Sequence, residues 1–195
     1  MGENHETKGG TIAHIARRIF HVSILIVPFV YYYFLELLAQ PKILHLCILA
    51  FIFFVFLFEK LRIRMKLVLF AQRFHEATHI SAFAWTMLSL GIILLVSPSA
   101  AYSIAIVATC AIVDPLLGEM RLRAVNHKII LVIGILVALA IWFVCARLYD
   151  FPVWFAVIIA PITVAAEWPT LKWIDDNALM MLVPLAIVLL LTALK

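Results

Sequence analysis

The sequence predicts an all-α protein, a bundle of about seven transmembrane helices whose amino terminus lies in the cytoplasm. Apolar residues make up 66% of the 195 residues and only 13% are charged, about half the charged fraction of soluble domains. The uncharged run from Ile80 to Val113 is 34 residues long, too long for one crossing of a hydrocarbon core of roughly 30 Å. It divides at Ser97-Pro98-Ser99, where a helix would stop. Strand-like alternation of apolar and polar residues is lacking, so we expect helices to satisfy the backbone.

Seven apolar segments follow one another along the chain, and several are shorter than the roughly 20 residues that a perpendicular helix needs. Their approximate bounds are Arg18–Leu38, Ile43–Phe58, Ile80–Val96, Ala100–Met120, Ile129–Ala146, Pro152–Ala166 and Ala178–Leu194. Residues 1–13 are rich in glycine and charge and predict a flexible cytoplasmic tail. Residues 14–195 then form a single transmembrane domain.

The distribution of Lys and Arg predicts the orientation. Successive connections between transmembrane helices lie on alternate sides of the membrane. This places 12 of these residues on the side of the amino terminus and three on the other, namely Lys42, Arg147 and Lys195. The positive-inside rule then puts the amino terminus in the cytoplasm. Topology and anionic phospholipids explain the net charge of +4, so charge gives no reason to expect a nucleic-acid partner. We expect a multi-pass protein of a prokaryotic inner membrane or a eukaryotic endomembrane.

Asp114 is the polar residue that topology explains least. It lies about 21 Å along the helix that begins near Ala100, inside the hydrocarbon core, where a carboxylate must face protein, water or a cation. Pro115 follows it and frees a backbone carbonyl one turn earlier. A structural ion pair with a neighbouring arginine is one interpretation. A functional site is the other, because carboxylates inside membranes are more often functional.

Asp175-Asp176-Asn177 opens the last apolar segment, and Glu167 ends the preceding one. Acidic residues at a helix start are ordinary caps, and one of the three should be one. Three oxygen-bearing side chains in a row exceed what a cap requires. Hard oxygen ligands beside a helix amino terminus can hold Mg²⁺ and receive phosphate. Glu167 has a plainer interpretation as a helix terminus beside an interfacial tryptophan.

His75-Glu76-Ala77-Thr78-His79 matches the H-E-x-x-H signature of zinc proteases. On one helix the two histidines would face a single metal, and Glu76 would activate water. A third ligand would come from Asp114 or Glu167. An intramembrane zinc metalloprotease is therefore one alternative function.

Four stretches, taken in order, resemble the CTP-dependent polyprenol, dolichol and phytol kinases. These stretches are Arg17-Arg18-x-x-His21, Arg73–Ala82, Val113–Gly118, and Glu167-Trp168-Pro169 with Asp175-Asp176-Asn177 and Pro184. The likeness is collinear over most of the chain, and its closing stretch is the most specific. Two features depart from the family pattern. Val113 stands where the family has Gly, and the Lys-Ser/Thr-x-Glu-Gly segment is not kept after Lys128.

The resemblance implies a kinase that transfers a phosphoryl group from CTP, or another nucleoside triphosphate, to an isoprenoid alcohol at the cytoplasmic face. Mg²⁺ would be the cofactor, and the ligands implied for it are Asp114, Glu167, Asp175 and Asp176. Groups implied to orient or activate the alcohol are His21, Glu76, His79 and Asp114. Residues implied to bind the nucleotide are Arg73, Gly118, Arg121, Arg123, Lys128 and Asn177. The further alternative is a lipid-binding or transport protein on the same scaffold without catalysis.

Overall fold

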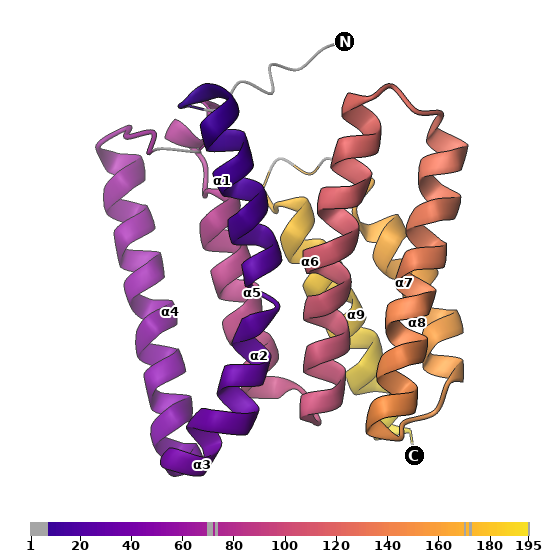
Figure 1. The fold of residues 1–195 in the computed structure, drawn as a ribbon. Helices are drawn as coiled ribbons and strands as arrows, with labels where there is room; N and C mark the ends of the chain where they lie inside the picture. The colour runs from indigo at the N-terminus through magenta and orange to yellow at the C-terminus, as the bar shows by residue number, and fades with distance from the viewer. Residues whose placement is uncertain (1–7, 70–71, 73, 170, 172, 195) are drawn as a thin grey trace.

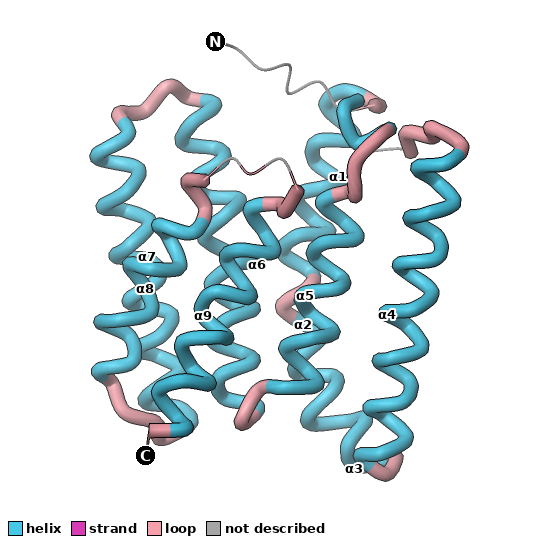
Figure 2. The backbone as a smooth tube through the Cα atoms, turned by 180° about the vertical axis from the view of Figure 1, so that it is seen from behind, coloured by secondary structure: helices cyan, strands magenta, loops and turns pink. Residues whose placement is uncertain are grey.

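The computed structural model describes residues 8–69, 72, 74–169, 171 and 173–194. It is 81% helical, and the described residues contain no strand, which confirms the all-α prediction. The helices pack as one bundle with their axes running roughly up and down (Figures 1 and 2). Their apolar composition explains this arrangement. A helix in a bilayer makes its backbone hydrogen bonds internally, so the helices differ only in which of their faces pack together.

Eleven helical elements follow in chain order among the described residues. They are α1 (Gly10–Ser23), α2 (Ile26–Val30), the π-helical turn η1 (Tyr31–Leu35), α3 (Glu36–Leu38), α4 (Pro41–Arg64), the 3₁₀ turn η2 (Phe74–Ala77), α5 (Ala82–Val96), α6 (Ala100–Leu122), α7 (His127–Tyr149), α8 (Trp154–Ala166) and α9 (Asp176–Ala193). Each of the seven predicted apolar segments coincides with helix.

Five helical runs are long and apolar enough to cross a membrane. They are Gly10–Leu38, which joins α1 to α3, and α4, α6, α7 and α9. The other two apolar helices, α5 and α8, have only 15 and 13 residues. A multi-pass membrane protein is therefore supported, while seven crossings and the cytoplasmic amino terminus stay predictions.

Helix α6 forms the core of the bundle, and α4 stands at its edge. In the apolar window of α6, 72% of the residues are buried, against 6% in α4. Small residues such as Ala101, Ala105 and Ala111 allow α1, α7 and α9 to approach α6 closely. The face of α4 is rich in exposed phenylalanine instead, which suits contact with lipid. The interior of the bundle therefore lies around α6.

Two boundaries differ from the prediction. Residues 10–13, predicted as part of a flexible tail, are helical, because α1 begins at Gly10. The second apolar segment, predicted to end near Phe58, continues as α4 to Arg64. The backbone then turns at Lys66, whose φ of 52° lies in the left-handed region. Periodicity did not reveal this break, because a single left-handed residue leaves no repeat in the sequence.

One end of the bundle holds the residues of chemical interest. The beginnings of α1, α5, α7 and α9 lie there, together with the ends of α4, α6 and α8 (Figure 1). The carboxyl terminus lies at the opposite end. We call the first end the site end.

Candidate functional site

Three carboxylates meet at the site end. Asp114 comes from α6, Glu167 is the residue that caps the end of α8, and Asp176 is the first residue of α9. One oxygen from each side chain lies within 4.8 Å of the other two. The sequence placed all three in the predicted metal site. The fold thus brings together side chains that are up to 62 positions apart. We call these three residues the carboxylate cluster.

The unequal lengths of α6 and α8 explain why these carboxylates meet. Asp114 precedes the end of α6 by eight residues, which places it about 12 Å below that end. Helix α8 has 13 residues and spans roughly 20 Å, whereas the 23 residues of α6 span roughly 34 Å. Because α8 stops early, its final residue Glu167 reaches the level of Asp114 instead of the outer rim.

The donor set of the cluster fits a hard divalent cation. The centre of an equilateral triangle of oxygens 4.8 Å apart lies about 2.8 Å from each, close to the roughly 2.0–2.6 Å of Mg²⁺ and Ca²⁺ bonds. Within the described part of the chain, Glu167 Oε2 has no hydrogen-bond partner although the side chain is fully buried. The buried Asn177 Oδ1, next to Asp176, also lacks one. Buried oxygens in this state need a donor or a cation.

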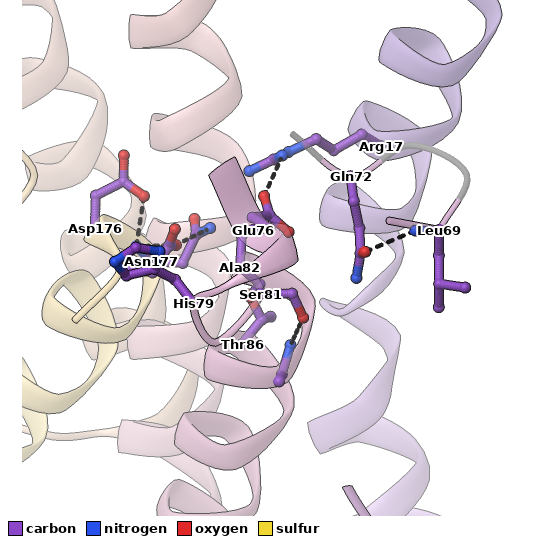
Figure 3. Close-up of polar contacts among 12 residues, drawn as sticks. Arg17, Leu69, Gln72, Glu76, His79, Ser81, Ala82, Thr86, Asp176 and Asn177 are labelled. Carbon is purple, nitrogen blue, oxygen red and sulfur yellow. Dashed lines mark hydrogen bonds and ion pairs between the residues drawn. The ribbon is translucent and has the colours of Figure 1, made fainter. Parts of the chain in front are cut away.

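Asp175, the fourth predicted metal ligand, does not belong to the carboxylate cluster. It caps the start of α9, where its Oδ1 accepts hydrogen bonds from the Asn177 amide at 3.1 Å and from Asn177 Nδ2 at 2.7 Å. Asp176 Oδ1 lies 3.0 Å from the same amide (Figure 3). Asp175 is therefore the capping residue that the sequence led us to expect among the three. Asn177, predicted to bind nucleotide, is turned toward the cap through its Nδ2.

His21 and Arg18 of α1 face Asp114. His21 Nε2 lies 3.4 Å from Asp114 Oδ2 and 3.1 Å from the Cys110 carbonyl oxygen, and the side chain is buried. Arg18 Nη1 lies 4.0 Å from the same Oδ2. Arg18 Nε also lies 3.4 Å from Glu119 Oε1, one turn further along α6. The predicted catalytic residue His21 is thus in direct contact with the cluster.

Gly118 has a structural role beside this contact. A Cβ at this position would lie 3.0 Å from Arg18 Nη1 and 3.1 Å from Arg18 Cζ. Such separations are too short for ordinary van der Waals contact, so glycine makes room for the arginine to cross α6. The resemblance implied a nucleotide contact for Gly118, which lies inside α6.

Arg121 pairs with Glu167 across the interface between α6 and α8. Its guanidinium carbon also lies 5.8 Å above the ring of Trp168, within cation–π range. Arg123 ends α6, and Lys128 lies in the first turn of α7. Both are exposed, and the phosphate-binding role predicted for them stays a prediction. Arg73, the remaining predicted phosphate ligand, falls outside the described residues.

The H-E-x-x-H motif does not lie on one α-helix. The 3₁₀ turn η2 ends at Ala77, and a bend carries Thr78 and His79, so the predicted helical geometry of a zinc site is wrong. Glu76 is buried and faces Arg17 Nη1 at 3.5 Å (Figure 3). His79 is exposed, and its Nδ1 lies 3.0 Å from Thr78 Oγ1. The side chain of His75 lies outside the described part of the chain.

Arg62 and Glu59 hold the loop before α5 and are not among the residues predicted from the sequence. Arg62 is 1% exposed, and all five of its N–H groups donate. The acceptors are Glu59 Oε1 and Oε2 and the carbonyls of Leu67, Glu76 and His79, at 2.6–3.0 Å. Glu59 Oε1 also accepts from the Ser81 amide at 2.5 Å. We call Arg62 and Glu59 with these partners the arginine clamp.

The clamp positions Glu76 and His79 relative to the start of α5. On the far side of the same loop, Gln72 Oε1 accepts from the Leu69 amide at 2.9 Å (Figure 3). A Glu and an Arg three residues apart at a helix end were visible in the sequence as a possible pair. In the count of Lys and Arg that predicts the orientation, Arg62 is not distinguished from the other cations.

Comparison with known proteins gives no relative. No protein-family model, curated protein or solved structure matches the chain. The chemistry of the site is therefore argued from its own residues.

Proposed function

We propose that the protein is an integral membrane kinase that transfers a phosphoryl group from CTP, or another nucleoside triphosphate, to an isoprenoid alcohol of the polyprenol, dolichol or phytol type. The carboxylate cluster is the observation that carries the proposal. Its three members belong to two of the four stretches that resemble such kinases. A purely structural network would have no need to hold three acidic oxygens within 4.8 Å of one another.

Asp114, Glu167 and Asp176 would hold Mg²⁺, because carboxylate oxygens are its preferred protein ligands. When bound, the ion neutralises charge on the phosphate oxygens during transfer. Arg18 lies beside Asp114 and Arg121 beside Glu167. Guanidinium groups in these positions are suited to bidentate contact with phosphate. The cluster and its two arginines thus provide a metal site and an anion site side by side.

His21 is our candidate for the residue that receives the proton of the acceptor hydroxyl. Its Nε2 faces two acceptor oxygens, the Cys110 carbonyl at 3.1 Å and Asp114 Oδ2 at 3.4 Å, so Nε2 carries a proton and Asp114 stabilises the imidazolium that forms. The nitrogen that would receive the hydroxyl proton is Nδ1. The buried position of His21 keeps bulk water away from this nitrogen. Water would otherwise compete with the alcohol as an acceptor.

The depth of the cluster suits an acceptor that stays in the membrane. Apolar helices surround the site, and their exposed side chains face the hydrocarbon region. The cluster lies about 12 Å below the end of α6, so the hydroxyl of a lipid need not leave the interface to reach it. A soluble nucleotide would enter from the site end.

An activity assay of the purified protein in nanodiscs tests the proposal. The donors are γ-labelled CTP and ATP with Mg²⁺, and the acceptors are polyprenol, dolichol, phytol and diacylglycerol. We expect transfer from CTP to an isoprenoid alcohol, and its loss in Asp114→Asn. Asp150→Asn is the matched control, because Asp150 lies at the opposite end with φ of 52°, which Asn tolerates. Folded protein without turnover in any combination would refute the kinase.

A lipid-binding or transport protein without catalysis is the second candidate. The ion pairs of Arg18 with Asp114 and Arg121 with Glu167 favour it, because they already compensate two of the three carboxylates. Complementation of a deletion strain distinguishes the two functions. If Asp114→Asn and Asp176→Asn both restore growth fully, the protein acts without metal-dependent chemistry.

A further inference from the structure

Arg121 and Glu167 form an unusual pair, because one partner is buried and the other is not. The Glu167 side chain has no exposed surface, whereas 39% of the Arg121 side chain is exposed. Glu167 Oε1 pairs with Arg121, while Oε2 has no hydrogen-bond partner among the described residues. Since Glu167 belongs to the carboxylate cluster, Arg121 neutralises a carboxylate that a metal ion would need.

The charges around the cluster limit what can be bound at once. Arg121 supplies the positive charge at Glu167, whereas Arg18 is shared between Asp114 and Glu119. A divalent cation bound to Glu167 would lie close to the Arg121 guanidinium. Like charges a few ångströms apart in a partly buried site repel strongly. A cation at the cluster and Arg121 at Glu167 therefore compete with each other.

We propose that Arg121 is the exchangeable counter-ion of Glu167. It leaves the carboxylate when a divalent cation binds to the cluster, and it then binds a phosphate-like oxyanion beside the cation. This inference rests on the metal site of the proposed function. It adds that occupation of the metal site creates the neighbouring anion site, so cation and oxyanion bind with positive cooperativity.

The surroundings of Arg121 permit this exchange. Its side chain leaves the last turn of α6, and its outer part is exposed, so the guanidinium can swing without unpacking the core. The Trp168 ring 5.8 Å away offers it a second favourable contact. Arg18 is held differently, because Gly118 provides the space in which it crosses α6 and Glu119 contacts its Nε. Arg121 is thus the cation that can move.

Direct titration of metal binding tests the exchange without any assay of catalysis. The whole protein in nanodiscs is titrated with MnCl₂, and free Mn²⁺ is measured by electron paramagnetic resonance. Arg121→Gln removes the competing cation, so we expect Mn²⁺ to bind on the order of 5-fold more tightly than in the wild type. Arg147→Gln, the same change on an exposed arginine at the opposite end, should leave Mn²⁺ affinity unchanged.

A second titration tests the oxyanion. Sodium sulfate carries a tetrahedral dianion and chelates Mn²⁺ weakly. In the wild type it should tighten Mn²⁺ binding about 5-fold or more, because sulfate captures the released arginine. This coupling should disappear in Arg121→Gln and persist in Arg121→Lys, which retains a mobile cation.

Three results would overturn the exchange. One is no Mn²⁺ binding to the wild type, and the second is unchanged or weaker Mn²⁺ binding in folded Arg121→Gln. The third is sulfate coupling that survives in that variant. If the predicted Mn²⁺ and sulfate effects are found but no acceptor is phosphorylated, the exchange stands and the kinase proposal alone fails.

Discussion

The arginine clamp and the carboxylate cluster lie at the same end of the bundle, and both are built from buried charge. In the clamp, one arginine uses all five donors, and its acceptors are a carboxylate and three backbone carbonyls. In the cluster, three carboxylates share one small volume, and Glu167 Oε2 and the neighbouring Asn177 Oδ1 have no partner among the described residues.

The two regions differ in how completely the hydrogen bonds of their buried charges are made. When all the hydrogen bonds of a buried charge are made within the fold, its removal affects folding. A buried charge that is incompletely matched is held in place by the rest of the fold, and it remains able to bind something else. Stability and function should therefore separate between these two regions.

The largest effect should follow from Arg62→Met in the clamp. The change leaves Glu59 buried without its cation and three carbonyls without a donor. We expect the free energy of unfolding to fall by about 3–5 kcal/mol, measured by denaturation in detergent micelles. Arg64→Met, two residues further on α4 and exposed, should cost less than about 0.5 kcal/mol. Equal costs for the two variants would show that the clamp is not the stabilising element.

Asp176→Asn in the cluster should leave stability nearly unchanged but reduce metal binding and activity. Removing one of three crowded negative charges relieves repulsion, so we expect the free energy of unfolding to stay within about 1 kcal/mol of the wild type. Mn²⁺ affinity and phosphoryl transfer should fall about 100-fold, equivalent to roughly 2.7 kcal/mol. Calorimetry of metal binding and the labelled-CTP assay measure these losses. A large loss of stability with unchanged metal affinity would show that the cluster stabilises the fold, as the arginine clamp does.

Gly118→Ala tests the packing between the cluster and α1. The added methyl group displaces the end of Arg18, at an expected cost of about 1 kcal/mol in unfolding free energy. In an Arg18→Ala background the obstacle is gone, so the same substitution should cost almost nothing. A double-mutant cycle of thermal unfolding measures this difference. Equal costs in both backgrounds would mean that the arginine is not what requires glycine.

The smallest effect belongs to His14→Ala. His14 Nε2 lies 3.2 Å from Glu119 Oε1, but the two side chains are 37% and 44% exposed. Solvent screens such a pair, so we expect a change below about 0.5 kcal/mol in the free energy of unfolding. We expect the loss in unfolding free energy to be smallest here because burial, and not the number of charges, determines it. A change above 1 kcal/mol at His14 would contradict it.

The sequence predicted the helices. It also predicted four metal ligands, and the fold brings three of them together. Helices were predictable because apolar runs of 15–25 residues specify them locally. Asp114 stood out because a carboxylate within an apolar run is costly, and Glu167 and Asp176 because they adjoin helix ends. That these three residues bind metal and take part in phosphoryl transfer stays a prediction.

The partners of these residues could not be predicted, because pairing across helices depends on packing and not on spacing. Glu59 and Arg62 looked like one more basic connection, yet they organise a loop that reaches Ser81. The resemblance implied a nucleotide contact for Gly118, and only the course of Arg18 over α6 shows why a side chain does not fit there. The end of α4 depended on Lys66 in the left-handed region, which residue type alone does not reveal.

The early end of α8 has a consequence for the surrounding bilayer. A helix of 13 residues covers roughly 20 Å of a hydrocarbon core of roughly 30 Å, so lipids beside it must thin or water must enter. Longer acyl chains would raise the headgroups above Glu167, and shorter ones would bring the aqueous phase closer to it. Lipid chain length can thus control access to Glu167 without altering any residue of the protein.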